Sequence, residues 1–274
     1  QNKNIPHKNA RSNIEHNSGC SSVNCLSLII YCNLFYTYDI INLVYHINKG
    51  VSNMQRLCNI FILTLCFFCF SQNVYAKEIK FIQVTDLMYR QNVSSQENLK
   101  NLVDNINSGD KVDFVVFTGD NIANAKKETL QEFLETIKSL KYPYYIELGD
   151  KDCLKSNGLS KDLYLKYVKS NSEQKFNSFN YTVKKDNIVF VFVDGAKEFL
   201  PAPNGFYKEN TLTWLDKTLT KYKKKHVIII QHFPLFDKSE TSTYNLYKAD
   251  LYNEILSKHN NVLMIVSGHY HDNI

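Results

Sequence analysis

From residue 79 onward, short apolar runs alternate with segments in which apolar residues recur at helical spacing. The apolar runs predict strands at 79–85, 112–118, 143–148, 226–230 and 262–266. The helical spacing predicts helices at 95–107, 126–140, 162–169, 209–222 and 248–259, the first of them capped by Ser94 or Ser95. Two further runs, 181–183 and 188–193, flank a polar turn and predict a hairpin. This alternation is typical of an α/β domain with mainly parallel strands.

The first 76 residues have a different composition. They contain six of the seven cysteines, five basic residues and two acidic residues, so most charged residues lie downstream. The chain as a whole has a formal net charge of +5. This modest excess does not indicate dedicated nucleic-acid binding, which usually needs a concentrated basic face.

Residues 54–76 have the layout of a secretory signal peptide. Met54 and Arg56 form a short positive start, 57–70 is an apolar run, and Val74 and Ala76 are the small residues before a cleavage point. The run is short for a membrane-spanning helix, which needs about 20 residues. We therefore expect export with cleavage after Ala76, and an uncleaved membrane anchor is the alternative. Residues 1–53 are not assigned to the mature fold, which leaves 77–274 as the domain.

Residues that can bind a metal follow five of the predicted strands. They are Asp86, Asp120, Asp150, His232 and His269, with His271 two positions beyond the last. Ligands bind at the carboxyl ends of parallel strands in α/β sheets, so these side chains should converge on one edge. A mixed set of carboxylates and imidazoles suits Zn, Mn or Fe.

Each of these residues also has a structural interpretation. An Asp after a strand is often a turn former, and a single His is often a hydrogen-bonded core residue. Five such coincidences at five strand ends, together with two imidazoles in the Gly-His-Tyr-His sequence of 268–271, favour the metal site.

The order of these motifs resembles the calcineurin-like metallophosphoesterase family. The motifs are Asp-Leu-Met at 86–88, Gly-Asp-Asn at 119–121, Gly-Asp-Lys-Asp at 149–152, Gln-His-Phe-Pro at 231–234 and Gly-His-Tyr-His at 268–271. The resemblance covers about 77–274. It implies a four-layer αββα sandwich, in which two packed mixed sheets are flanked by helices, and a two-metal centre at the strand ends. Relatives continue beyond the last motif, so we expect the fold to be truncated at its C-terminus.

The resemblance also assigns roles to the ligands of two divalent metal ions. Asp120 would bridge both ions, Asp86 and His271 would bind the first, and Asp150, His232 and His269 the second. Such a pair of ions, held roughly 3.5–4 Å apart, clamps a phosphate and activates a hydroxide for in-line attack.

Three positions depart from the family pattern. Met88 stands where the family has a histidine ligand, and its soft thioether suits Mn or Zn poorly, so we expect the first metal to bind weakly. Asp150 replaces an asparagine and adds a negative charge. Lys151 replaces the histidine near the leaving group, which makes it a candidate catalytic residue that can contact phosphate but is a poor proton donor at neutral pH.

These observations predict an exported metal-dependent phosphoesterase that acts on small phosphomonoesters or phosphodiesters. The alternative is a degenerate relative that binds one metal or a phosphate-bearing ligand without useful turnover. The Gly-x-Ser-x-Gly and Gly-x-Gly-x-x-Gly motifs are absent, which argues against a serine hydrolase and a dinucleotide enzyme. Membrane contact is expected only through an uncleaved signal or anchor. The basic cluster at 221–226 is interpreted as a solvated helix end that complements the helix dipole. The alternative is a patch that binds phosphate or nucleic acid.

Overall fold

The computed structural model describes residues 23–28, 78–172, 175–200, 202–235 and 246–271. The predicted signal peptide at 54–76 lies outside these ranges, and so does most of the 1–53 segment. Among the described residues, no helix has the length and apolar character needed to cross a bilayer.

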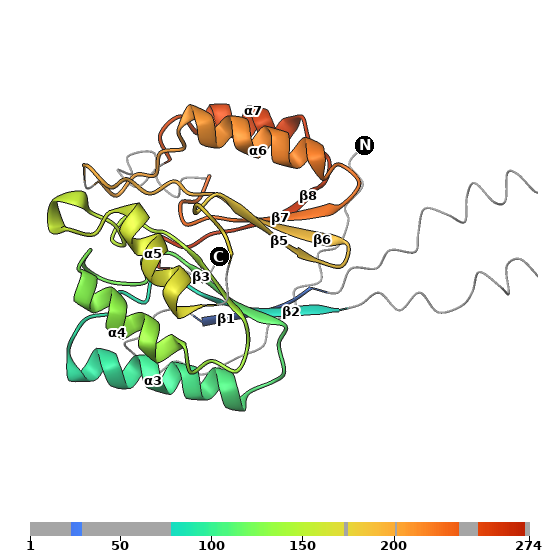
Figure 1. Ribbon diagram of the computed structural model, residues 1–274. Coiled ribbons are helices and arrows are strands. Elements are labelled where there is room, and N and C mark those ends of the chain that lie inside the picture. Colours follow the sequence, from blue (N-terminus) through green and yellow to red (C-terminus); the bar gives the residue numbers. More distant parts are fainter. Residues whose placement is uncertain (1–22, 29–77, 173–174, 201, 236–245, 272–274) are drawn as a thin grey trace, which may run out of the picture.

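Two four-stranded sheets form the centre of the domain (Figure 1). The first sheet has the order β1-β2-β3-β4 and consists of β1 (Val23–Leu28), β2 (Ile79–Val84), β3 (Phe114–Thr118) and β4 (Tyr144–Glu147). The second sheet has the order β5-β6-β7-β8 and consists of β5 (Tyr181–Lys185), β6 (Ile188–Phe192), β7 (His226–Ile230) and β8 (Val262–Val266). Each sheet is parallel apart from its first strand, which pairs antiparallel with the second, so both sheets are mixed.

Helices cover the outer faces of the two sheets (Figure 1). The first sheet carries α3 (Val93–Ser108), α4 (Lys127–Ile137) and α5 (Lys161–Asn171), and the second carries α6 (Glu209–Lys221) and α7 (Ala249–Ser257). A short 3₁₀ turn, η1 (Lys155–Asn157), precedes α5. The order of layers is helix, sheet, sheet, helix, which is the predicted α/β class and the four-layer arrangement.

Strand β1 was not predicted. It pairs with β2 in antiparallel register from Val23 opposite Val84 to Leu28 opposite Ile79. It lies within the 1–53 segment that the sequence analysis left outside the domain, so the domain boundary stays a prediction. The cap of α3 was also predicted wrongly. Asn92, not Ser94 or Ser95, is the N-cap, and its side chain accepts a hydrogen bond from the backbone N–H of Ser95.

Aromatic rings join the two sheets in the interior. Phe114 of β3 stacks on Phe81 of β2 with ring centres 5.3 Å apart, and the edge of Phe190 from β6 meets both rings. All three side chains are fully or almost fully buried. Edge-to-face packing of this kind adds to the free energy gained by burial. It also fixes the two sheets relative to one another, and therefore fixes the loops at their carboxyl ends.

Candidate metal centre

The loops that follow β2, β3, β4, β7 and β8 meet at one edge of the molecule. Backbone hydrogen bonds join the first two of these loops, because the N–H of Asp86 donates to the carbonyl of Gly119 and that of Met88 donates to the carbonyl of Asp120. The last two are joined by a bond from the N–H of Gly268 to the carbonyl of His232. The N–H of His269 donates to Oδ2 of Asp86 and that of Lys151 donates to Oδ1 of Asp120, so hydrogen bonds connect all five loops.

Several candidate ligands sit on left-handed backbone. The φ angles are 53° at Asp86, 49° at Asp120, 77° at His269 and 52° at His271. Such a conformation costs roughly 1–3 kcal/mol at a residue other than glycine and persists only where the surroundings enforce it. Its concentration at this edge indicates that the backbone is bent to aim these side chains inward.

Glycines let the loops approach one another closely. A Cβ on Gly119, whose φ is 94°, would lie 2.6 Å from Nδ1 of His232. A Cβ on Gly268 would lie 1.9 Å from Oγ1 of Thr85 and 2.7 Å from Oδ2 of Asp86. The glycine that precedes each ligand in the Gly-Asp and Gly-His motifs is therefore required by space.

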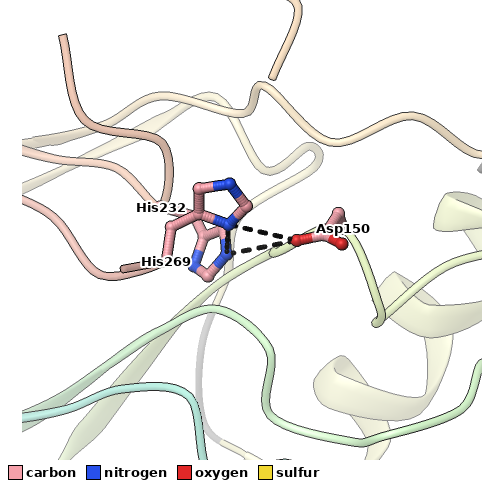
Figure 2. A group of neighbouring side chains, drawn as sticks. All are labelled: Asp150, His232 and His269. Atoms are coloured by element: carbon pink, nitrogen blue, oxygen red, sulfur yellow. Dashed lines mark hydrogen bonds and ion pairs between the residues drawn. The ribbon is translucent and has the colours of Figure 1, made fainter. Parts of the chain in front are cut away.

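The first group of candidate ligands consists of Asp150, His232 and His269 (Figure 2). Asp150 Oδ1 lies 3.6 Å from His232 Nε2 and 3.3 Å from His269 Nδ1, and these two nitrogen atoms are 3.1 Å apart. Figure 2 shows both rings turned toward the carboxylate. One oxygen and two imidazole nitrogens therefore surround a common point.

The second group consists of Asp86, Asp120 and His271. His271 Nε2 lies 3.3 Å from Asp86 Oδ1, and its side chain is largely exposed whereas both carboxylates are buried. His232 Nε2 links the two groups, at 3.6 Å from Asp120 Oδ1 and 4.0 Å from Asp86 Oδ1. All six residues predicted as ligands are thus brought together, divided as the resemblance implied. Their role in binding metal stays a prediction.

Hydrogen bonds orient the ligand atoms. Nδ1 of His232 donates to the carbonyl of Thr118 at 2.8 Å, because a carbonyl oxygen can only accept. This bond leaves Nε2 facing the carboxylates, which is the arrangement typical of a metal-binding histidine. Oδ2 of Asp86 accepts hydrogen bonds from the Thr85 hydroxyl at 2.6 Å and from the N–H of His269 at 2.9 Å. Oδ1 of the same carboxylate is buried and accepts no hydrogen bond within the described part of the chain.

The clustered charges shift the proton affinities of the site. Burial raises the pKa of Asp120, and the neighbouring Asp150 carboxylate adds to that effect. Burial alone would lower the pKa of His232, but the carboxylates of Asp120, Asp150 and Asp86 raise it to about 9. Burial would likewise raise the pKa of Asp150, but His232, His269 and the ammonium group of Lys151 lower it overall. The carboxylates of Asp86, Asp120 and Asp150 thus stabilise positive charge placed among them, which favours cations.

This donor set fits divalent metal ions. Buried carboxylates are stable only when they are paired or coordinate metals, and Oδ1 of Asp86 points into the cluster without a hydrogen bond. Carboxylate oxygens mixed with imidazole nitrogens suit Zn, Mn or Fe. Asp86, Asp120 and His271 could hold one ion, and Asp150, His232 and His269 another.

Lys151 and Met88 differ in how they contact the site. The ammonium group of Lys151 forms an ion pair with Asp150 and lies 3.7 Å from Oδ2 of Asp120, so it touches one carboxylate of each group. Its backbone N–H also donates to Oδ1 of Asp120 at 2.9 Å. Met88 contributes a backbone N–H to the carbonyl of Asp120.

Sequence reasoning assigned no role to Asp152 and expected only polar contacts from Asn121, and these two residues hold two of the site loops together. Asp152 is fully buried and accepts hydrogen bonds from the N–H groups of Ile122 and Gly149 and from the side chain of Asn121. Asn121 also donates to the carbonyl of Glu147. The signal was present in the motifs at 119–121 and 149–152, where Asn121 directly follows Asp120 and Asp152 lies two positions after Asp150.

Comparison with known proteins identifies the family of the chain. The sequence profile of the family described as calcineurin-like phosphoesterase matches residues 79–273. The chain belongs to the calcineurin-like phosphoesterase family. It is therefore grouped with phosphoester hydrolases, and all six candidate ligands lie within the matched residues.

Individual relatives of this calcineurin-like phosphoesterase are distant. It is 25% identical over 172 residues to a probable glycerophosphodiester phosphodiesterase GpdQ from Arcobacter nitrofigilis. The match covers 59% of the present chain and 57% of that relative. A crystal structure of a dimetal phosphatase from Danio rerio has a TM-score of 0.48 and 16% identity, and the match covers 70% of this chain and 81% of that one. The chain thus spans little more than half the length of its curated relative.

Proposed function

We propose that this protein hydrolyses small phosphoesters at a centre of two divalent metal ions. The observation that carries the proposal is the convergence of six candidate ligands from five strand ends into two groups that share the linking atom His232 Nε2. When bound, two such ions cancel the repulsion between an anionic phosphoester and hydroxide and lower the pKa of water. The family supports a phosphoesterase at this general level.

The protein's own residues would bind and orient the substrate. The ammonium group of Lys151 lies beside Asp120 and Asp150 and is partly exposed, so it can donate hydrogen bonds to phosphate oxygens at the mouth of the site. Lys197 supplies a second ammonium group, which donates to Oδ1 of Asn204 at 2.6 Å. Burial lowers the pKa of Lys197, and the charge of Asp150 partly opposes that effect.

A phosphodiester substrate is favoured over a monoester. The curated relative is described as a glycerophosphodiester phosphodiesterase. In addition, Asp150 is a carboxylate at a position of the centre where the resemblance implies a neutral amide. A diester carries one negative charge where a monoester carries up to two, so the added carboxylate repels a diester less.

A degenerate binding module is the second candidate function. The ion pair between Lys151 and Asp150 favours it, because the ammonium group already neutralises a carboxylate that a metal ion would need. Met88 adds to this argument, since it stands where the resemblance implies a histidine ligand for the group of Asp86, Asp120 and His271. On this proposal the protein holds one metal ion or a phosphate-bearing ligand and turns over slowly or not at all.

The deciding experiment measures metal content and turnover of the purified full chain. Activity on p-nitrophenyl phosphate and on bis(p-nitrophenyl) phosphate is measured with Mn or Zn for the wild type, Asp120→Ala and the control Asp104→Ala, which changes an exposed residue of α3. Two ions per chain, with turnover that only Asp120→Ala abolishes, support the enzyme. One bound ion without turnover on either ester supports the binding module.

Export is also proposed, on the basis of the signal-peptide layout at 54–76. Sequencing the N-terminus of the mature protein tests it. A new N-terminus at residue 77 supports cleavage and export, and an N-terminus upstream of Met54 overturns this assignment.

A further inference from the structure

The edge of the domain opposite the metal centre carries a dense group of lysines. Helix α6 ends at Lys221, and the turn from there to β7 carries three exposed lysines at 223–225. Helix α7 ends nearby and is followed by Lys258 and His259. These segments enclose a hollow of about 430 Å³, and its lining residues are Lys223, Lys224, Lys225, His226, Lys258, His259, Asn260 and Asn261.

The β5–β6 hairpin adds further positive charge. The ammonium group of Lys184 lies 5.4 Å from the centre of the Tyr222 ring, and that of Lys221 lies 5.3 Å from it. Burial of the ring would by itself raise the pKa of Tyr222. A hydrogen bond with Thr182 and these two ammonium groups lower this pKa overall. We call the whole group the basic end, and its members are Lys184, Lys185, Lys221, Lys223, Lys224, Lys225 and Lys258.

Few acidic groups neutralise the basic end. Glu254 pairs with Lys258 at 2.9 Å, and Asp216 pairs with His259 at 2.7 Å. Asp186, in the hairpin turn, contributes its backbone carbonyl to Lys225. Within the described residues, Lys223 and Lys224 form no ion pair. The basic end therefore keeps a net positive charge and loosely held ammonium groups.

The position of the basic end is set by the direction of the strands. The candidate ligands follow the carboxyl ends of both sheets, whereas the basic end lies at their amino ends (Figure 1). Lys185 belongs to the second sheet, but its ammonium group lies 5.4 Å from the ring centre of Phe114, the first residue of β3 in the first sheet. Strand β2 starts at the same edge, where the carbonyl of Lys80 accepts a hydrogen bond from the N–H of Asp113.

In the sequence, β2 follows closely on the apolar run at 57–70. The chain therefore enters the domain at its basic end, whether or not the run is cleaved. An anionic lipid surface attracts clustered lysines electrostatically, so the basic end by itself supplies the attraction. We propose that the basic end docks on an anionic phospholipid surface and leaves the metal centre facing away from the membrane.

A nucleic acid is a poorer fit than a lipid surface. Binding of single-stranded nucleic acid combines a basic groove with exposed aromatic rings on which the bases stack. The aromatic rings that these lysines contact, those of Tyr222 and Phe114, are both buried. The ammonium group of lysine is a point charge on a flexible side chain. Such groups suit an array of lipid phosphates, whose spacing is not fixed.

The test measures partition of the full chain onto vesicles of phosphatidylcholine with and without phosphatidylglycerol. The variant is Lys223→Gln/Lys224→Gln/Lys225→Gln, and the matched control is Lys100→Gln/Lys127→Gln/Lys166→Gln, which removes the same charge from exposed positions on α3, α4 and α5. Each lysine near an anionic surface contributes about fivefold, so the variant should lose about 100-fold of its preference for anionic vesicles. The ratio of anionic to neutral partition cancels any contribution from the apolar run.

Three results would overturn the proposal. They are equal partition onto both vesicles, equal losses in the variant and its control, and binding to a single-stranded RNA oligomer with no preference for anionic vesicles. Hydrolysis of soluble esters by the Lys223→Gln/Lys224→Gln/Lys225→Gln variant should match the wild type, because these residues lie at the opposite edge. Vesicle binding is measured without turnover, so its failure would leave the proposed function intact.

Discussion

The Cα atom of Gly149 lies directly behind the carboxylate of Asp120, so that a Cβ at this glycine would come within 2.2 Å of Oδ1 of Asp120. The loop after β4 therefore supports the side chain at the middle of the candidate metal centre. This contact also explains why a glycine precedes Asp150, since any side chain at 149 would displace the residue proposed to bridge both ions.

Gly149→Ala should abolish phosphoester hydrolysis while Gly158→Ala should not. Alanine at 149 forces Asp120 or its loop to move, whereas a Cβ at Gly158 meets no atom within 4 Å. Gly158 has a φ of 83°, so its alanine variant should lose roughly 1 kcal/mol of stability and keep its activity. Urea unfolding and the ester assay on both variants test this prediction. Wild-type activity in Gly149→Ala would show that the position of Asp120 is not critical.

Met88→His should strengthen metal binding at the group formed by Asp86, Asp120 and His271. The backbone at Met88 is left-handed, with a φ of 50°, and histidine tolerates this conformation better than most residues. We expect the metal concentration for half-maximal activity to fall by at least about 10-fold. Residues that only hydrogen-bond to metal ligands already change metal affinity by this much when they are mutated. Metal titration with an activity readout measures it. Unchanged activity in a protein that already holds two ions would refute the account of a weak first site.

Lys151→Met should separate the two roles proposed for this ammonium group. If Lys151 contacts the phosphate, its loss raises KM and lowers kcat, whereas if it only competes with metal for Asp150, its loss raises metal affinity. We expect the first outcome on esters, with kcat/KM down by about 10²-fold, the range found for single electrostatic contacts. Lys155→Met, on the nearby 3₁₀ turn, is the control. Tighter metal binding together with unchanged kinetics would favour the degenerate module.

Glu147→Gln should change how stability depends on pH. Burial raises the pKa of Glu147 well above its ordinary value, and the carboxylate of Asp194 adds to the shift. The folded protein therefore keeps a proton that the unfolded chain loses above its ordinary glutamate pKa. This stabilisation is complete at low pH and falls by about 1.4 kcal/mol per pH unit until the pH passes the folded pKa.

The glutamine variant cannot lose that proton, so it should gain stability relative to the wild type as the pH rises. Urea unfolding of both proteins at about pH 5 and about pH 8 measures the difference. The exposed variant Glu135→Gln should follow the wild type at both values. A difference between wild type and Glu147→Gln that does not change with pH would show that Glu147 ionises normally.

Much of the fold follows from local pattern. The predicted strands and helices from 79 to 266 each correspond to an observed element, because their apolar spacing reports directly which face is buried. Strand β1 could not be predicted in this way, since its extended conformation depends on pairing with β2 rather than on its own sequence. Asn92 is the N-cap of α3 because its side chain accepts a hydrogen bond from the N–H of Ser95. This contact depends on the conformation of the loop that leads into the helix.

The sequence by itself determined the chemistry of this protein: which residues end the strands, that they are carboxylates and imidazoles, and that lysines gather at 221–226. Only the tertiary structure decided which of them meet. His232 Nε2 lies between the two ligand groups because the sheets pack face to face, and Lys151 reaches two carboxylates because Gly149 lets the loops touch. Distances between side chains on separate strands depend on how the sheets pack and twist, and no local pattern in one strand contains that information.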